Sequence, residues 1–228
     1  MSSKGTQVFD IDAGLLDDEL LASQMRFLVG LVGAGRDLGA QTQVPAGWQG
    51  HEDALALRLN QVQEESALRG GAVPGRVPVT PESVIWPIPQ ADGLEAQLAM
   101  VRERAGQGRV GRIRLPRNDH ELWASYKYSV LARNYRAYQS FGQRVAARSI
   151  PLNELWLSMV SASRVAPLAG GIRNALQHMW GYVSEHSRIS PQTSDLPALA
   201  REIQQQAAAH RVSYLLNSTA LGELRAWL

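Results

Sequence analysis

The stretch from Arg109 to Gln143 reads RVGRIRLPRNDHELWASYKYSVLARNYRAYQSFGQ and joins a basic run to a helical pattern. Asn118 followed by Glu121 has the form of a capping box, in which side chains satisfy the unpaired N–H groups at a helix start. Spacings of i, i+4, i+8 and i+11 then place on one helix face Leu122, Tyr126, Val130 and Arg133. The stretch therefore predicts a helix, which we interpret as the element that bears the functional site.

The remainder of the chain also shows helical rather than strand-like spacing. Helices are expected from Asp17 or Asp18 to about Val32 and over residues 49–68, 92–105, 172–184, 196–210 and 212–228, with another after Pro151. A break of the last helix at Gly222 is the alternative. Glycines and a proline predict a loop over residues 33–47, and residues 72–91 contain five prolines. These patterns predict an all-α fold, a single compact multi-helix domain with a Pro-rich crossing loop. Residues 1–105 and 106–228 are expected to form two helical parts that share one core.

Composition excludes several classes of protein. The 228 residues include no cysteine, so disulfides, thiolate catalysis and cysteine-ligated metal centres are excluded. No run approaches the roughly 18 apolar residues that a membrane span requires, so we expect no membrane partner. The start lacks the pattern of a secretory signal, which favours a cytoplasmic location.

Charge is unevenly distributed along the chain. Residues 102–148 carry 11 Lys/Arg against 3 Asp/Glu, whereas residues 1–101 carry 6 against 13. A basic block of this kind focuses positive potential and favours a polyanionic partner such as DNA. The alternative is a solvated basic face that has no partner.

Motifs for metals and common cofactors are missing from the sequence. The five histidines include no pair at i, i+3 or i, i+4, and no HExxH, GxSxG or phosphate-binding GxxxxGK motif occurs. We therefore expect neither a metal site nor a cofactor.

The candidate catalytic residues are Tyr126, Lys127, Arg133 and Asn134. A lysine in partly apolar surroundings can act as a base or nucleophile, and a charged one can bind phosphate. Arginine suits phosphate or carboxylate, and asparagine can read a base edge. Two alternatives remain open. The Lys127 stem could lie over Trp123, and Arg133 could pair with an acidic residue of the N-terminal half.

Candidate nucleic-acid-binding residues lie in the basic run and at two tryptophans. The arginines of the run, which could follow a phosphate backbone, are Arg109, Arg112, Arg114 and Arg117. Trp48 and His51 occur together in GWQGHE at a helix entrance, and Trp48 or Trp123 could stack on a base. The alternative for Trp48 is a core anchor.

Residues 7–71 resemble the helical pyrimidine-dimer DNA glycosylase superfamily. The matching features are QVF at 7–9, LLDDELLASQ at 15–24, GWQGHEDAL at 47–55 and ALRGG at 67–71. Members of that superfamily use an N-terminal amine as nucleophile, helped by a glutamate on the first helix. This chain departs at both points, because residues 1–5 precede the expected start and Ser23, Gln24 and Arg26 stand where a carboxylate is wanted. What the resemblance implies for this part is the scaffold.

The segment LWASYKYSVLARNYRAYQSFG, residues 122–142, carries a second resemblance. It is similar to a bacterial domain of unknown function sometimes found beside thiouracil desulfurases, and it resembles the amino acid:DNA transferase family of phage thymine hypermodification. That family implies a phosphorylated 5-hydroxymethyluracil in DNA whose leaving group is displaced by the amine of an amino-acid co-substrate. It also implies the cytoplasm of the host cell if the protein is phage-encoded.

The expected roles follow from this chemistry. The arginine run, Lys127 and Arg133 would stabilise the departing phosphate, and Lys127 or Tyr126 would take the proton of the amine. Three alternatives remain: a non-catalytic DNA-binding module, a pyrimidine-dimer glycosylase-like repair protein, and an enzyme of free pyrimidine nucleobases or nucleotides.

Overall fold

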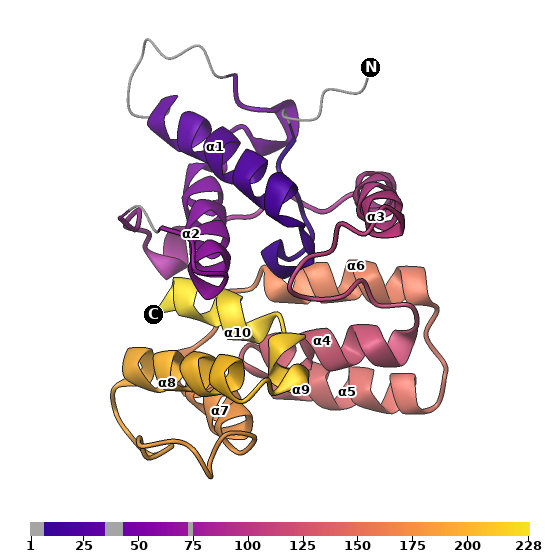
Figure 1. The fold of residues 1–228 in the computed structure, drawn as a ribbon. Coiled ribbons are helices and arrows are strands. Elements are labelled where there is room, and N and C mark those ends of the chain that lie inside the picture. Colours follow the sequence, from indigo (N-terminus) through magenta and orange to yellow (C-terminus); the bar gives the residue numbers. More distant parts are fainter. Residues whose placement is uncertain (1–6, 35–42, 73–74) are drawn as a thin grey trace. The chain divides into compact units, whose positions relative to one another are not determined.

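A computed structural model of the chain describes residues 7–34, 43–72 and 75–228 (Figure 1). These residues form ten α-helices and four 3-10 helices, and they contain no strand. The predicted all-α, multi-helix class is therefore confirmed for the described part of the chain. Contacts divide it into two compact units, Met1–Gly111 and Arg112–Leu228. The boundary predicted between residues 105 and 106 lies in the last turn of α3 (Ala91–Gly106).

The first unit is built around two long helices. Its elements are η1 (Ala13–Leu15), α1 (Asp18–Ala34), η2 (Ala46–Trp48), α2 (Glu52–Leu68), η3 (Pro81–Ser83) and α3. Helix α1 packs against α2, and α2 also contacts η1. The helices predicted in this region are confirmed with small shifts at their ends. Of the loop predicted over residues 33–47, Gly33 and Ala34 instead complete α1, and residues 35–42 lie outside the described residues.

Helix α2 is buried over twelve consecutive residues, from Ala54 to Glu65. The apolar side predicted for this helix is confirmed, but its polar side is buried as well. Most of those polar side chains form hydrogen bonds, as buried polar groups generally do, whereas the Gln63 Oε1 has no hydrogen-bond partner among the described residues. The Asn60 carboxamide donates to the Val77 carbonyl (2.8 Å) and accepts from the Val77 N–H (3.0 Å). The helix thus holds part of the Pro-rich segment as well as the core.

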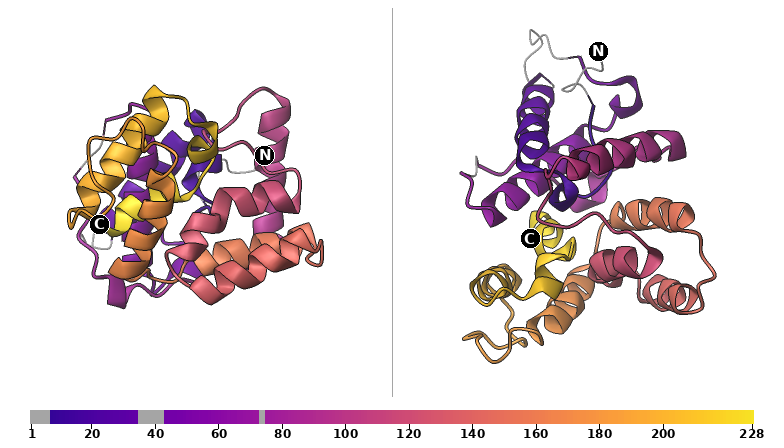
Figure 2. Two further views of the ribbon diagram at one scale, coloured as in Figure 1. Left: turned by 90° about the horizontal axis from the view of Figure 1, so that it is seen from below. Right: turned by 45° about the vertical axis from the view of Figure 1, so that its right-hand side comes forward.

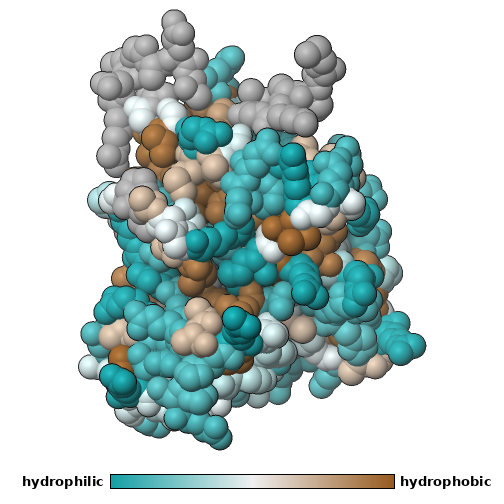
Figure 3. All heavy atoms as spheres, in the orientation of Figure 1, coloured by the Kyte–Doolittle hydropathy of each residue, from teal (hydrophilic) through white to brown (hydrophobic). Residues whose placement is uncertain are grey.

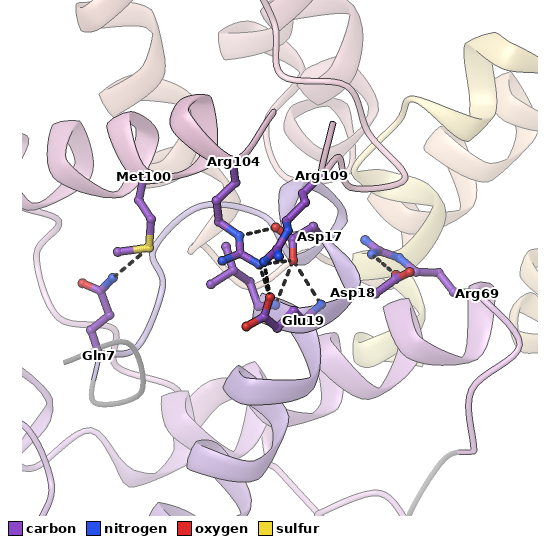
Figure 4. A network of polar contacts seen from close by, with 9 residues as sticks. Gln7, Asp17, Asp18, Glu19, Arg69, Met100, Arg104 and Arg109 are labelled. Atoms are coloured by element: carbon purple, nitrogen blue, oxygen red, sulfur yellow. Dashed lines mark hydrogen bonds and ion pairs between the residues drawn. The ribbon is translucent and has the colours of Figure 1, made fainter. Parts of the chain in front are cut away.

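A buried ion pair joins the start of α1 to the end of α3 (Figure 4). The Asp17 carboxylate caps α1, accepting from the N–H groups of Glu19 and Leu20 at 3.0 Å each. Arg104 donates to both Asp17 oxygens and to Glu19 at 2.8 Å. Burial raises the pKa of Asp17, but the Arg104 hydrogen bonds and the two N–H groups outweigh it, so this pKa lies below its usual range.

The second unit is arranged around α4 (Asp119–Leu131), which makes its main contacts with four other helices. These are α5 (Tyr135–Ala146), α6 (Leu152–Ser163), α7 (Ala169–Trp180) and α10 (Ala220–Glu223). Helices α4, α5 and α6 lie side by side (Figures 1 and 2). The remaining elements are α8 (Leu196–Ala209), α9 (Ser213–Leu216) and η4 (Leu224–Trp227). Figure 3 shows one face of the molecule, on which hydrophilic residues surround small hydrophobic patches.

The predicted central helix is correct at its start but breaks after Leu131. Asn118 caps α4 by accepting from the Glu121 N–H (2.9 Å). The Glu121 carboxylate, however, accepts from the Arg117 N–H (2.9 Å), so the reciprocal half of the capping box is absent. The break occurs because extended Asn134 caps a new helix, α5, accepting from the Ala137 N–H at 2.9 Å.

Two other predicted helices have different bounds. The helix expected over residues 172–184 begins earlier, at Ala169, and ends at Trp180. Gly170 and Gly171 lie inside its first turn. The helix expected over residues 212–228 is instead three short pieces, α9, α10 and η4, because the chain leaves the helix at Asn217 and Ser218.

Replacing Arg104 with Met should lower the free energy of unfolding by about 3–5 kcal/mol, because Asp17 would remain buried and charged without its main partner. Chemical denaturation measures the loss. The double variant Asp17→Asn/Arg104→Met should recover part of the stability, because an asparagine oxygen can still cap α1. Arg144→Met, at the partly exposed Arg144–Glu154 pair, is the control and should cost less than ~1 kcal/mol. Equal losses of unfolding free energy in Arg104→Met and Arg144→Met would contradict the larger contribution assigned to the buried pair.

Gly170 and Gly171 of α7 allow a test of how closely α7 approaches the end of α4. A Cβ on Gly171 would overlap the backbone carbonyl oxygen of Ala132, which cannot move without disturbing the end of α4. A Cβ on Gly170 would meet no atom within 4 Å. Gly171→Ala should therefore destabilise the protein by about 1–3 kcal/mol. Gly170→Ala should leave the melting temperature unchanged or raise it slightly. A Gly171→Ala variant as stable as Gly170→Ala would refute the close approach of α7 to α4.

Candidate functional site

A cavity of about 520 Å³ opens in the second unit beside the first turns of α4. One wall is the segment before α4, another is α4 itself, and the third is α9 with the residue after it. The lining residues are Arg114, Leu115, Pro116, Arg117, Glu121, Ala124, Ser125, Ser213, Tyr214 and Asn217. The cavity therefore joins part of the basic run to polar side chains from about a hundred residues later in the sequence.

Hydrogen bonds between side chains and backbone groups hold the basic run in place at this cavity. The Arg112 guanidinium donates to the carbonyl oxygens of Leu216 and Ser218, the latter at 3.3 Å. The Arg114 N–H donates to the Asn217 carboxamide oxygen at 3.2 Å. The carboxamide nitrogen of Asn217 donates to the Ser213 carbonyl at 2.8 Å. Arg112 and Asn217 thus build the wall, and the Arg114 side chain is left exposed at the cavity.

The cavity lining is positively charged. Arg117 forms an ion pair with Glu121, with 2.7 Å between guanidinium nitrogen and carboxylate oxygen. The hydrogen bonds from Arg117 hold the pKa of Glu121 below its usual range, so this carboxyl is ionised at neutral pH. The lining therefore contains two guanidinium groups, those of Arg114 and Arg117, and one carboxylate. The hydroxyl groups of Ser125, Ser213 and Tyr214 add neutral hydrogen-bonding groups to the lining. Such a lining suits an anionic, phosphate-bearing ligand.

Tyr214 connects the cavity to a cluster of aromatic side chains and Lys127. The Tyr214 ring stacks on Tyr182 with centroids 4.7 Å apart and meets Tyr128 edge-on at 6.3 Å. The Lys127 Nζ lies 4.8 Å from the ring centroid of Tyr214 and 4.9 Å from that of Tyr128. A cation placed over ring faces in this way is attracted by their quadrupoles. Lys127 therefore contributes positive charge beside a residue of the cavity wall.

The four predicted catalytic residues are not brought together at one surface. Lys127 is half-buried and contacts tyrosine rings instead of lying over Trp123. Tyr126 is only 1% exposed and packs edge-on against Trp156. Asn134 caps α5. None of the four lines the cavity.

Arg133 forms a buried ion pair within the second unit. Its guanidinium forms a bidentate pair with Glu223, at 2.8 and 2.9 Å, and also donates to the carbonyls of Ser129 and Val165. The Arg133 side chain is 1% exposed. The predicted alternative of an ion pair is thus correct in kind, but the partner comes from the C-terminal segment and not from the N-terminal half.

The predicted nucleic-acid-binding residues fall in different places. Arg114 and Arg117 line the cavity, and Arg112 supports its wall. Arg109 belongs to the first unit and pairs with Glu19. Trp48, also in that unit, is buried against Trp86 with ring centroids 6.0 Å apart, which confirms the alternative of a core anchor.

His51 and Trp123 were also predicted to contact nucleic acid. The His51 Nδ1 lies 2.7 Å from the Ile85 carbonyl oxygen, which attaches the Pro-rich segment to the start of α2. Trp123 is half-buried and packs on Tyr138 and Phe141 of α5, with ring centroids 5.4 and 6.4 Å away. Trp123 thus remains accessible at the surface of the second unit.

Ser213, Tyr214 and Asn217 were missed by the sequence reasoning. They occur in SYLLNS, which has no basic or glycine-rich pattern that would mark a site. Only their position beside the basic run gives them a role at the cavity. Within the described residues no group of three or more His, Asp or Glu side chains could hold a metal ion, and every helix is too short or too polar to cross a bilayer.

Comparison of the chain with known protein families, with characterised proteins and with solved structures finds no match. The two family resemblances therefore rest on the quoted sequence segments.

The tyrosine cluster predicts a pH-dependent stability. Burial raises the pKa of the Tyr128 hydroxyl well above its usual range, and hydrogen bonds with Tyr182 and Tyr214 act in the same direction. In the unfolded chain this hydroxyl loses its proton near pH 10, whereas the folded protein retains it. The contribution of Tyr128 to stability is therefore complete below about pH 10 and is lost as the pH rises further.

Urea denaturation between pH 8 and 11 tests this dependence. Tyr128→Phe should lose less stability over that range than the wild-type protein, because it has no buried phenol to ionise. Tyr135→Phe, which alters an exposed tyrosine, should follow the wild-type curve. Parallel curves for all three proteins would contradict the proposed burial effect.

Proposed function

We propose that this protein binds DNA through its second unit and that the cavity at Arg114 and Arg117 receives a phosphorylated group of that DNA. The observation that carries the proposal is the composition of the lining, which holds two arginines, one carboxylate and three residues with hydroxyl groups. Anion binding at such a lining draws on charge-assisted hydrogen bonds, and arginine can bind a phosphate through two parallel hydrogen bonds. The excess of positive charge in residues 102–148 also attracts DNA, and it does so over a longer range.

The proposed activity is transfer of an amino acid onto phosphorylated 5-hydroxymethyluracil in DNA, as the resemblance of residues 122–142 implies. The amine nitrogen attacks the methylene carbon on C5 of the base, a C–N bond forms, and the C–O bond to the phosphate breaks. Phosphate leaves with the bonding electron pair, and the ammonium proton passes to water. Arg114 and Arg117 would stabilise the charge of the departing phosphate, with Lys127 adding positive charge beside Tyr214.

A non-catalytic DNA-binding module is the second candidate. A specific observation favours it: Tyr126 and Arg133, two of the residues expected to do chemistry, are each about 1% exposed. Their side chains serve the core and a buried ion pair, so neither contacts a substrate in this conformation. A module of this kind would use the same cavity and the same positive charge, but it would leave the DNA unchanged.

The deciding experiment offers the protein DNA with phosphorylated hydroxymethyluracil together with a mixture of amino acids. The DNA is then digested to nucleosides for mass spectrometry. A new nucleoside heavier by one amino-acid residue would establish transfer. Unchanged nucleosides, with salt-dependent binding of the same DNA, would favour the binding module. Unchanged nucleosides without binding would refute both candidates.

Replacing Arg114 with Ala should weaken DNA binding and reduce by about one the slope of log affinity against log salt, because one phosphate contact is lost. The exposed Arg114 side chain has no role in the fold comparable to that of Arg133, so the variant should unfold at the wild-type temperature. Arg201→Ala, on α8 and outside the cavity, is the matched control and should leave the slope unchanged. Equal slopes for the two variants would rule out Arg114 as a phosphate contact.

A further inference from the structure

Four aromatic side chains form a row along the contact of α4 with α5, which we term the aromatic ladder: Tyr135, Tyr138, Trp123 and Phe141. The Tyr135 and Tyr138 rings are nearly parallel, with centroids 6.2 Å apart and an interplanar angle of 19°. Trp123 follows at 5.4 Å from Tyr138 and inclines to it by 43°. Phe141 lies 6.4 Å from Trp123. Each ring of the ladder therefore supports its neighbour in a fixed orientation.

The ladder ends at the protein surface. Tyr135 is 58% exposed, and the other three residues are half-buried. The Tyr135 hydroxyl accepts a hydrogen bond from the Gln139 Nε2 at 3.3 Å, which helps to orient the Tyr135 ring. Val145 is the only residue of α5 that is fully buried. Helix α5 thus presents most of its length to solvent, with an aromatic ring supported in place at its start.

Helix α5, which carries three of the four rings, is basic. The α5 sequence YRAYQSFGQRVA contains two arginines and no acidic residue, and Arg148 follows the helix. Arg136 is exposed and lies next to Tyr135 in the sequence. Arg144 pairs with Glu154 at 2.7 Å, so its charge is partly balanced. Rings and cations on one helix are the combination that binds the bases and the phosphates of a nucleic-acid strand together.

We propose that the aromatic ladder and Arg136 form a binding site for single-stranded nucleic acid. Unpaired bases would stack on the exposed ring of Tyr135, and Arg136 would contact the backbone phosphate. In a duplex the faces of each base are covered by its neighbours, so only an unpaired strand offers them to a ring. Stacking of this kind tolerates any base, because every base has a π-face.

This inference deepens the proposed function and rests on it for the identity of the strand as DNA. Helix α4 contributes to both sites, because Trp123 belongs to the ladder, and Glu121 and Ser125 line the cavity. A strand on the ladder would have its bases unpaired. Enzymes that do chemistry on a base commonly take it out of the stack, and a strand on the ladder would present its bases in that state.

The test measures fluorescence anisotropy of the full-length protein with a labelled oligothymidylate of about 20 nucleotides and with a duplex of equal length. Single-strand affinity should exceed duplex affinity. Tyr135→Ala should weaken single-strand binding about fivefold or more, and Tyr135→Phe, which keeps the ring, should bind as the wild type does. Arg136→Gln should reduce the salt slope by about one, whereas Arg201→Gln should not. Circular dichroism and the melting temperature verify that each variant folds.

Three outcomes would overturn the inference. They are equal or tighter binding of the duplex, unchanged affinity of Tyr135→Ala, and binding of anionic lipid vesicles that depends on Tyr135 without any binding of the oligonucleotide. The proposed function fails separately, through its own variant and assay. If no transfer is detected and Arg114→Ala binds DNA as the wild type does, but strand binding still depends on Tyr135, the proposed function is refuted and the aromatic ladder is supported. Transfer on duplex DNA without strand binding would remove the ladder alone.

Discussion

The buried pair of Arg133 and Glu223 is the interaction on which the second unit depends. It joins the residue where α4 gives way to α5 with the short helix α10, some ninety residues later. Both side chains are removed from solvent, so neither charge could remain there without the other. The hydroxyl groups of Ser129 and Thr219 meet at 2.7 Å, and the Thr219 N–H donates to the Ser125 carbonyl. Together these contacts hold the C-terminal segment against α4.

The candidate cavity is a consequence of that attachment. Because residues 213–219 lie along α4, the Asn217 carboxamide oxygen accepts a hydrogen bond from the Arg114 N–H. The Arg112 guanidinium donates to the Leu216 carbonyl at the end of α9. Arg114, Ser213 and Tyr214 then line the same cavity. The surroundings of three arginines of the second unit thus differ. Arg133 and Arg112 donate hydrogen bonds to the chain itself, whereas Arg114 is exposed.

The two proposed binding surfaces differ in the physical force they would use. The cavity offers charge and hydroxyl groups in a concave space, which suits a phosphate with defined geometry. The aromatic ladder offers an exposed ring with an adjacent cation, which suits a strand without regard to its sequence. Under the proposed function, the ladder would bind the strand whatever its sequence, and the cavity would bind the phosphate of one modified base. Their joint dependence on α4 is therefore the most informative feature of the second unit.

The sequence by itself determined the helical class, the start of α4 at Asn118 and the burial of Leu122, Tyr126 and Val130, because spacing and capping are local properties. It also located the basic run, of which Arg114 and Arg117 line the cavity. Asparagine is a strong helix cap, so the sequence contains a local signal for the break at Asn134. The helical spacing continues up to that residue, however, and predicted no break. Only tertiary structure decided that Arg133 pairs with Glu223, that the polar side of α2 is buried, and that Tyr214 and Asn217 reach the cavity. Each of these depends on residues far apart in the chain, and the local pattern of residue types does not state which distant partner a side chain will meet.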